Sequence, residues 1–244
     1  MNKIAYVTGG CGGIGTAICR KLHDLGHTVI AGCGPNADGE GWLAAQRADG
    51  YRFTLSHADI TDWDAAKAAF DRVHDEFGRV DILVNNAGIT RDAVFRKMTL
   101  ADWRAVIDTN LTGLFIVTKQ VIDGMAERGW GRIVNISSIN GQKGQFGQTN
   151  YSAAKAGVHG FTMALAQEMA GKGVTVNTVA PGYIATEMVM AIREDVRDKL
   201  VEAIPVKRLG RPEEIAAIVA WLAGDDAAFA TGAIYPVNGG MHMQ

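Results

Sequence analysis

The chain has 244 residues, of which 48% are hydrophobic and 20% are charged. This composition can supply a substantial hydrophobic core and excludes an intrinsically disordered chain. A formal net charge of −2 excludes the broad basic field that attracts a nucleic-acid backbone or an anionic membrane. Apolar stretches such as residues 215–223 are shorter than the ~20 residues that cross a bilayer, so we expect neither nucleic acid nor membrane as a partner.

The start of the chain and its cysteines predict a reducing, cytoplasmic location. An apolar run follows the first three residues directly and leaves no room for a signal peptide. Cys11, Cys19 and Cys33 are odd in number and lack the spacing of metal ligands. We therefore expect buried or neutral thiols and no metal site.

Short β-branched runs alternate with longer helical patterns along the whole chain. Strands are predicted at residues 3–8, 28–31, 52–56, 81–84, 132–136, 174–179 and 233–237. Helices are predicted at residues 14–25, 42–48, 63–77, 101–125, 151–170 and 213–222. This alternation predicts an α/β fold with a parallel sheet, because parallel neighbours need crossover connections. Without a linker, repeat or low-complexity segment, residues 1–244 are predicted to form one domain.

The least regular region, residues 182–205, follows a predicted strand end. Ligands of open parallel sheets bind beyond the carboxyl ends of the strands. We therefore expect residues 182–205 to cover the substrate.

A glycine-rich turn lies between the first predicted strand and the first predicted helix. Its sequence is Thr-Gly-Gly-Cys-Gly-Gly-Ile-Gly at residues 8–15, which departs from the G-x-G-x-x-G spacing. Glycines let a pyrophosphate approach the backbone, and a helix N-terminus offers free N–H groups to it. The turn predicts dinucleotide binding, with an ordinary strand–helix turn as the alternative.

Polar residues also follow the third and fourth predicted strands. Asn-Asn-Ala-Gly at residues 85–88 could hold the sheet opening in shape or contact a cofactor, or it could be a plain turn. Asp59 could accept a hydrogen bond from an adenine amino group, or it could cap the next helix.

Tyr151 and Lys155 are predicted on one helix face, four residues apart. A phenol, with a pKa of about 10, exchanges protons poorly at neutral pH unless a nearby ammonium favours the phenolate. Lys155 could also bind a cofactor ribose; an accidental pair is the alternative. Upstream, the Ser138 hydroxyl could bind a substrate carbonyl, and Asn110 could hold a water that relays protons to Lys155.

In their joint order, these residues resemble the short-chain dehydrogenase/reductase family along nearly the whole chain. The resemblance implies a Rossmann-type, doubly wound parallel sheet of about seven strands with helices on both faces, and a homotetramer. It implies a catalytic tetrad of Asn110, Ser138, Tyr151 and Lys155. It also implies dinucleotide contacts from Gly9, Gly13, Ile14, Gly15, Asp59, Ile60, Asn86, Ala87, Gly88, Tyr151, Lys155, Pro181 and Gly182.

Within this family, residues 88–98, 141–151 and 181–186 resemble the acetoacetyl-CoA reductases of polyhydroxybutyrate biosynthesis. This resemblance implies NAD(P)H-dependent reduction of the 3-keto group of acetoacetyl-CoA to (R)-3-hydroxybutyryl-CoA. It implies substrate contacts from Asp92, Lys97, Gln145, Phe146, Gln148 and Tyr183. The alternatives are a 3-oxoacyl-acyl-carrier-protein reductase of fatty-acid synthesis and a non-catalytic nucleotide-sensing protein.

The loop after the second predicted strand departs from this resemblance. Many acetoacetyl-CoA reductases prefer NADPH and carry arginines there, but residues 32–41 contain no Lys or Arg. A 2′-phosphate would lack a cationic partner in this loop. Asp38 or Glu40 could instead accept from ribose hydroxyls, or both could be solvated charges. We therefore expect NADH to be favoured, with NADPH as the alternative or second cofactor.

Overall fold

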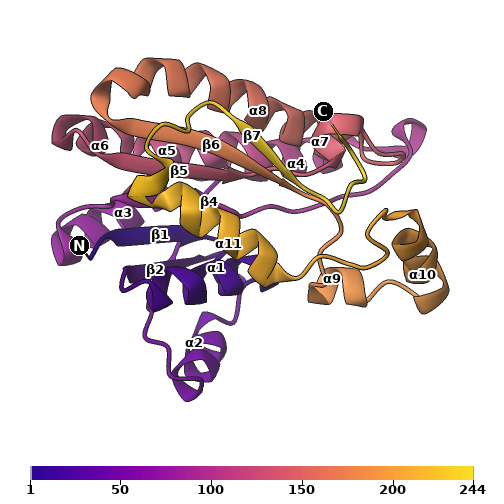
Figure 1. Cartoon of the computed structure of the whole chain (residues 1–244), viewed down its shortest axis with the longest axis horizontal. Coiled ribbons are helices and arrows are strands. Elements are labelled where there is room, and N and C mark those ends of the chain that lie inside the picture. The colour runs from indigo at the N-terminus through magenta and orange to yellow at the C-terminus, as the bar shows by residue number, and fades with distance from the viewer. Residues whose placement is uncertain (1, 244) are drawn as a thin grey trace.

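The computed structural model describes residues 2–243, which form one seven-stranded sheet (Figure 1). Every pair of neighbouring strands is parallel, and the order is β3-β2-β1-β4-β5-β6-β7. The strands are β1 (Ile4–Thr8), β2 (Thr28–Cys33), β3 (Thr54–His57), β4 (Ile82–Asn85), β5 (Gly131–Ile136), β6 (Val174–Pro181) and β7 (Ile234–Val237). The order reverses direction after β3, which confirms the predicted doubly wound, Rossmann-type α/β sheet.

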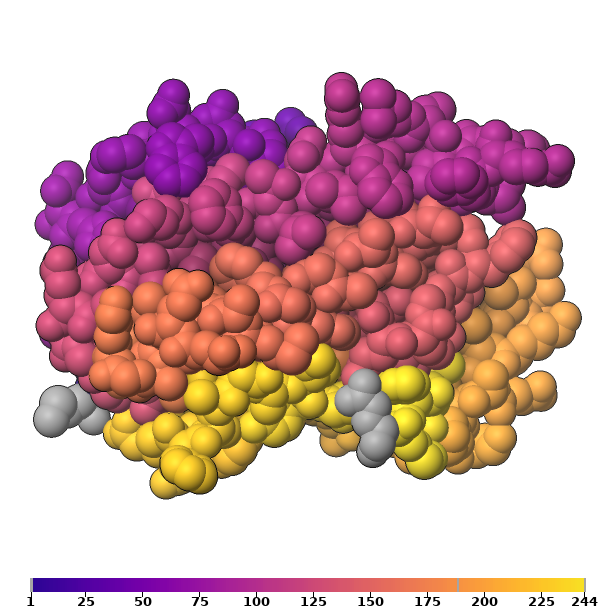
Figure 2. Space-filling view, turned by 90° about the horizontal axis from the view of Figure 1, so that it is seen from above, coloured from indigo at the N-terminus to yellow at the C-terminus, as the bar shows by residue number. Residues whose placement is uncertain are grey.

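Side chains that alternate along the strands build a separate hydrophobic core on each face of the sheet. In β1, Ala5 and Val7 belong to one core, whereas Tyr6 between them belongs to the other. The first core is covered by α1 (Gly13–Asp24), α2 (Gly39–Ala48) and α11 (Pro212–Ala223). The second is covered by α3 (Trp63–Phe77), α5 (Gly113–Lys119), α6 (Ile122–Arg128) and α8 (Thr149–Met169). Figure 2 shows the outer surface of this second layer.

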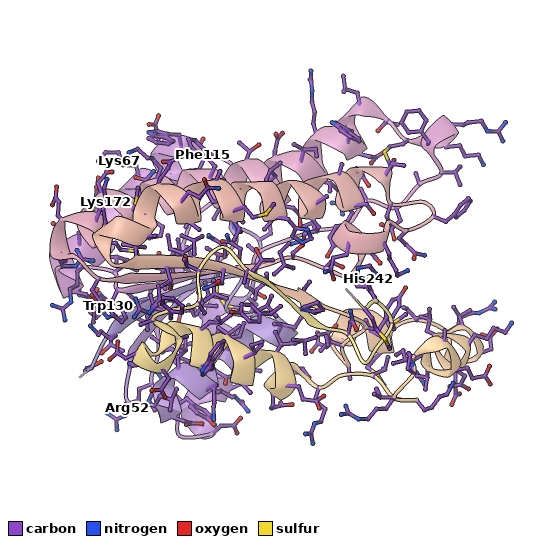
Figure 3. All side chains as sticks on the ribbon, turned by 45° about the horizontal axis from the view of Figure 1, so that its top comes forward. Arg52, Lys67, Phe115, Trp130, Lys172 and His242 are labelled. Atoms are coloured by element: carbon purple, nitrogen blue, oxygen red, sulfur yellow. A yellow bond between two sulfur atoms is a disulfide. The ribbon has the colours of Figure 1, made fainter. Side chains whose placement is uncertain are left out.

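The two ends of the sheet differ in the segments that gather there (Figure 3). Trp130 precedes β5 and lies at the amino ends of the strands, whereas His242 follows β7 and lies near their carboxyl ends. The short helices α7 (Asn140–Lys143), α9 (Glu187–Met190) and α10 (Glu194–Ala203) follow strand ends on this carboxyl side. The site is therefore expected at this edge.

The predicted helix over residues 101–125 is wrong as a single element. The structure has α4 (Leu100–Ile107), a π-helical turn (Asp108–Thr112), α5 and, after a break at residues 120–121, α6. Residues 182–205, predicted to be irregular, contain α9 and α10. Because π-helical turns commonly occur at functional sites, the interruption at Asn110 indicates that this segment belongs to the functional site.

The expectation of free thiols is wrong for two of the three cysteines. Cys11 and Cys33 form a disulfide, with their Cα atoms 6.0 Å apart, whereas Cys19 is free and buried. The reason is the sheet register: β1 and β2 are neighbours, with Thr8 opposite Gly32, so the turn after β1 lies beside the end of β2. Sequence spacing gave no signal for this proximity, which depends on strand order.

Among residues 2–243, no helix has the length and apolar character that spanning a bilayer requires. In the same range, no three or more His, Cys, Asp or Glu side chains gather as a metal site.

Substitutions in α1 test the packing of the first core. Leu22 is 0% exposed and belongs to that core, whereas Leu25, one turn later, is 52% exposed. Leu22→Ala should lower the free energy of unfolding by about 2–5 kcal/mol, because it leaves a cavity in a close-packed interior. Leu25→Ala is the matched control and should change it by less than about 0.5 kcal/mol. Urea denaturation at one protein concentration measures both; equal effects would contradict the packing described.

Candidate functional site

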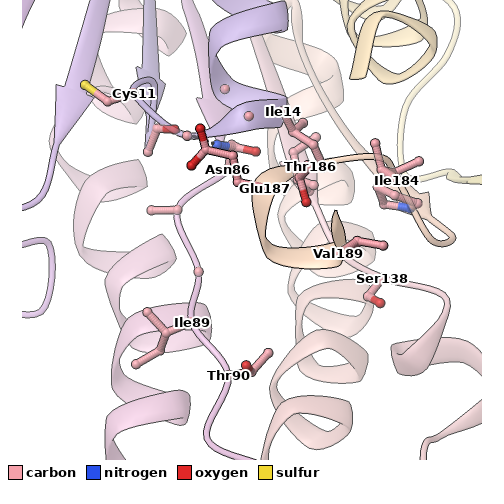
Figure 4. A pocket seen from close by; sticks show the side chains of 18 of the residues that line it. Cys11, Ile14, Asn86, Ile89, Thr90, Ser138, Ile184, Thr186, Glu187 and Val189 are labelled. Atoms are coloured by element: carbon pink, nitrogen blue, oxygen red, sulfur yellow. Dashed lines mark hydrogen bonds between the residues drawn. The ribbon is translucent and has the colours of Figure 1, made fainter. Parts of the chain in front are cut away.

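Two adjoining cavities, of about 550 and 410 Å³, open at the carboxyl edge of the sheet. Both reach Gly9, Cys33, Gly34 and residues 87–89, so they meet between β1, β2 and β4. Every predicted dinucleotide contact lines one of them. The larger cavity (Figure 4) is lined by Gly9, Gly13, Ile14, Gly15, Asn86, Ala87, Gly88, Tyr151, Lys155, Pro181 and Gly182. The smaller cavity is lined by Gly9, Ala87, Gly88, Asp59 and Ile60.

The glycine-rich turn forms a backbone surface that fits a pyrophosphate. Gly9 has a φ of 61°, which favours glycine, and a Cβ on Gly15 would collide with the Gly9 carbonyl. No side chain caps α1, and its first turn has no acidic residue. The N–H groups at the start of α1 are thus available to an anion, and the helix dipole favours one.

Asn86 fixes this turn to the neighbouring strand end. Its side-chain amide donates to the carbonyls of Thr8 and Gly9, each at 3.0 Å. The Thr8 hydroxyl in turn accepts from the backbone N–H groups of Asn86, at 2.9 Å, and Ala87, at 3.0 Å. Asn85 is different: it is buried and donates to the side chain of Asn135. The run at residues 85–88 therefore holds the sheet opening in shape, one of the two roles predicted for it.

Three members of the predicted tetrad face the larger cavity. Tyr151 and Lys155 come from the first turns of α8, and Ser138 comes from the loop after β5. The Lys155 ammonium is buried, donates to the Ile136 carbonyl at 2.8 Å and lies 5.7 Å from the centre of the Tyr151 ring. Figure 4 places Ser138 across the cavity from Cys11.

Asn110 lies behind the cavity wall, in the π-helical turn. Its amide nitrogen donates to the carbonyls of Val106, at 2.8 Å, and Ile89, at 2.9 Å. Its buried Oδ1 has no hydrogen-bond partner among the described residues. A Cβ on Gly88 would collide with this Oδ1 and would lie 3.5 Å from the Lys155 Nζ. Asn110, Gly88 and Lys155 are therefore neighbours, and the free Oδ1 can accept a hydrogen bond from a water or a ligand between them.

Burial controls the proton affinities of the tyrosine and the lysine. It raises the pKa of Tyr151; a hydrogen bond with Ser138 opposes this rise, and the charge of Asp92 adds to it. Burial also lowers the pKa of Lys155 to about 8. The expected lowering of the Tyr151 pKa by Lys155 is thus not what this arrangement gives. At neutral pH the phenol keeps its proton and the amine is mostly charged, which suits donation of a proton.

The six predicted substrate contacts surround the site but line neither cavity. Asp92 and Gln148 are joined, because the Gln148 amide donates to the Asp92 carboxylate at 2.9 Å. Gln145 accepts from Lys143 at 3.4 Å, Phe146 is 86% exposed, and Lys97 is exposed on a short 3₁₀ turn. Tyr183 lines a separate cavity beside residues 204–210; burial raises its pKa, and the charge of Asp92 adds to this rise.

The acidic residues near the adenosine end take different roles. Asp38 caps α2 by accepting from the Gly41 N–H at 2.9 Å, and neither Asp38 nor Glu40 lines a cavity. Asp59 lines the smaller cavity and accepts from the Thr61 hydroxyl at 2.7 Å. The helix-cap alternative for Asp59 is wrong, since Asp62 caps α3.

Several residues around the site were missed by the sequence analysis. Ile184, Thr186, Glu187 and Val189 line the larger cavity opposite Ile89 and Thr90 (Figure 4). Their only sequence signal was their place in the irregular region 182–205. His159 was missed entirely: it shares a 2.8 Å hydrogen bond with Ser137, whose hydroxyl also donates to the Lys155 carbonyl. Its position one turn after Lys155 on α8 was the available signal.

A family model described as short chain dehydrogenase matches residues 3–197. The chain belongs to the short-chain dehydrogenase family. It is 70% identical to the acetoacetyl-CoA reductase of Cupriavidus necator over 242 residues, which cover 99% of this chain and 98% of that protein. It is 55% identical to the acetoacetyl-CoA reductase of Allochromatium vinosum over 245 residues, which cover all of both chains. It is 46% identical to the 3-oxoacyl-acyl-carrier-protein reductase of Vibrio harveyi, over 99% of this chain and 98% of that one.

The lowered pKa of Lys155 sets a testable pH dependence for this short-chain dehydrogenase. Its amine should titrate near pH 8 in the unliganded protein, where an ordinary lysine titrates at about 10.4. NMR of protein with labelled lysine ε-carbons measures this directly, and Lys155→Met identifies the resonance. Because the ammonium is lost above its pKa, kcat/KM for reduction should fall as the pH rises past about 8. A Lys155 resonance titrating near 10 would contradict the geometry.

Proposed function

We propose that this short-chain dehydrogenase is an acetoacetyl-CoA reductase, which reduces the 3-keto group of acetoacetyl-CoA to (R)-3-hydroxybutyryl-CoA with NAD(P)H. The juxtaposition of Tyr151, Lys155 and Ser138 on one cavity wall, facing the glycine-rich turn, is the observation that carries this proposal. Two full-length relatives with that name, at 70% and 55% identity, support the choice of substrate. The proposed pathway is polyhydroxybutyrate biosynthesis.

The side chains at the cavity can perform the proton chemistry of this reduction. The Ser138 hydroxyl can donate to the substrate carbonyl oxygen and stabilise the negative charge that develops there. The protonated Tyr151 can then give its proton to that oxygen. Lys155, with a water held at the free Oδ1 of Asn110, can return a proton to the phenol. When bound, the reduced nicotinamide supplies the hydride to the 3-carbon.

The turn and the strand ends would hold the dinucleotide. The N–H groups at the start of α1 fit its pyrophosphate, and Asp59 in the smaller cavity can accept from its adenine amino group. Lys155 and Tyr151 would meet the ribose next to the nicotinamide. Residues 182–205 are proposed to cover the substrate, which Asp92, Lys97, Gln145, Phe146, Gln148 and Tyr183 would contact.

We also propose that residues 1–244 form a single domain that assembles as a homotetramer in the cytoplasm. Phe229 is fully exposed, and Trp221 in α11 is 43% exposed. Contact with another chain would remove the apolar surface of both side chains from water. An acyl-CoA is the proposed small-molecule partner.

Tyr151→Phe tests the proposed proton donor. Loss of the hydroxyl should lower kcat by about 10²–10⁴-fold, the usual contribution of a general acid. Dinucleotide affinity, measured by fluorescence titration, should stay within a few-fold of the parent protein. Tyr235→Phe is the matched control, because it removes a hydroxyl from β7, away from the cavities. An unchanged kcat for Tyr151→Phe would refute the assignment.

Comparing kcat/KM for the same acyl group on CoA and on acyl carrier protein distinguishes an acetoacetyl-CoA reductase from a carrier-protein reductase. The sequence similarity to a 3-oxoacyl-acyl-carrier-protein reductase, at 46% identity, is the observation that favours this second candidate. We expect kcat/KM for acetoacetyl-CoA to exceed that for the same acyl group on acyl carrier protein. The reverse order would favour the carrier-protein enzyme, and no dinucleotide oxidation with either thioester would favour a nucleotide sensor.

Cofactor preference is the remaining part of the proposal. Residues 32–41 carry no cation to pair with a 2′-phosphate, and Asp38 is engaged as a helix cap. We expect kcat/KM to be higher with NADH than with NADPH. Inserting a cation by Asn36→Arg, at the wall of the smaller cavity, should shift the ratio toward NADPH. A strong NADPH preference in the parent protein would contradict the argument from loop charge.

A further inference from the structure

Two cysteines meet at the junction of the two cavities, and the proposed chemistry uses neither. Cys11 belongs to the glycine-rich turn, and Cys33 ends β2. Both line the larger cavity, and Cys33 also lines the smaller one. Their 6.0 Å Cα separation is typical of disulfide-bonded pairs, and the structure joins their sulfur atoms.

The surroundings of the pair are open on the side of the cavities. A Cβ on Gly34, next to Cys33, would meet no atom within 4 Å, and one on Gly12, next to Cys11, would meet only the Gly9 carbonyl, at 3.5 Å. Cys11 is partly exposed, whereas Cys33 is 3% exposed. Small reagents can therefore reach the Cys11 sulfur from the cavity, and a ligand that extends from one cavity into the other passes beside both sulfur atoms.

We infer that Cys11 and Cys33 are a reversible oxidation site whose disulfide weakens dinucleotide binding. In the oxidised form the bridge spans from the turn to the end of β2 at the junction that the adenosine ribose must cross. In the reduced form the bridge is absent, and the partly exposed Cys11 thiol can rotate about its Cα–Cβ bond and leave that path. This inference rests on the proposed function in one respect, namely that the two cavities hold a dinucleotide.

The oxidation balances with a low-molecular-weight disulfide as oxidant. The Cys11 thiolate attacks one sulfur of that disulfide, which forms a mixed disulfide and releases one small thiolate. The Cys33 thiolate then attacks the Cys11 sulfur, which forms the Cys11–Cys33 bond and releases the second small thiolate. The two protons lost by the cysteines end on the released thiols. Two electrons pass from the cysteine pair to the oxidant, and an excess of small thiol reverses both steps.

Cys19 provides an internal control. It lies in α1, is 0% exposed, and burial raises its pKa well above that of an ordinary thiol. A buried, protonated thiol reacts slowly with disulfides. Cys19→Ala should therefore leave the response to oxidation intact, whereas Cys11→Ser and Cys33→Ser should each abolish it.

The experiment compares reduced protein with protein oxidised by glutathione disulfide, after removal of the small molecules. Peptide mapping by mass spectrometry should find the Cys11–Cys33 linkage only in the oxidised sample. The Kd for NADH, from fluorescence titration, should rise about tenfold on oxidation and return on reduction. In the Cys11→Ser and Cys33→Ser variants, the ratio of oxidised to reduced Kd should be close to one.

Three outcomes would overturn the inference: no Cys11–Cys33 linkage after oxidation, equal Kd values in the two forms, or no binding of NADH or NADPH by the reduced protein. Turnover of acetoacetyl-CoA by the reduced protein is measured in parallel. The reduced protein could bind the dinucleotide more tightly than the oxidised protein does and yet not reduce acetoacetyl-CoA. That result would refute the proposed substrate and leave the inference about the cysteine pair intact.

Discussion

Parallel pairing of all seven strands is the constraint on which the site depends. Because the strands share one direction, their carboxyl ends lie at one edge, and segments distant in sequence meet there. Beyond the last ladder pairs, backbone groups lose their strand partners and must be satisfied by side chains. The Thr8 hydroxyl accepts hydrogen bonds from two N–H groups of the loop after β4. In the other direction, the Asn86 side-chain amide donates to the carbonyls of Thr8 and Gly9. This exchange makes the edge polar and fixed before a ligand binds.

The Lys155 ammonium at this edge is buried, which costs it most of its hydration. Only the Ile136 carbonyl and the neighbouring polar atoms compensate its loss of hydration, and the low pKa of about 8 is the consequence. The same burial raises the pKa of Tyr151. Because the free phenol and the free amine have similar pKa values, burial separates the two, with the pKa of Tyr151 above that of Lys155. Transfer of a proton from the charged amine to a Tyr151 phenolate is therefore favourable. In the unliganded state at neutral pH, the Tyr151 phenol is protonated and the Lys155 amine is mostly charged, so both groups hold a proton that they can give.

The fold and the centre of the site could be predicted from the sequence because both depend on local patterns. Alternating strand and helix runs imply a parallel sheet, and Tyr151 and Lys155 share a helix face through their spacing alone. The rest depends on contacts between distant segments. The Cys11–Cys33 bond requires knowing that β2 adjoins β1, and the π-helical turn at Asn110 interrupts a hydrophobic period that is otherwise helical. Asp38 was expected either to accept from ribose hydroxyls or to be a solvated charge, and its actual role as the cap of α2 depends on where that helix begins.

The two sides of the larger cavity are held with different strength. On one side, the ends of β4 and β5 contribute Val84 and Ile136 to the first core, and Ala154 and Lys155 in the first turns of α8 are buried. On the other, α9 and α10 follow Gly182, where a Cβ would lie 2.8 Å from the Asn238 backbone, so the exit from β6 is fixed. A second attachment follows α10, where Gly210 donates to the Tyr183 carbonyl at 2.9 Å. Between these attachments, α10 contains no buried residue. Displacing α10 exposes little apolar surface, so this helix, which lies outside the lining of the larger cavity, can move while the proton-transfer residues stay in place.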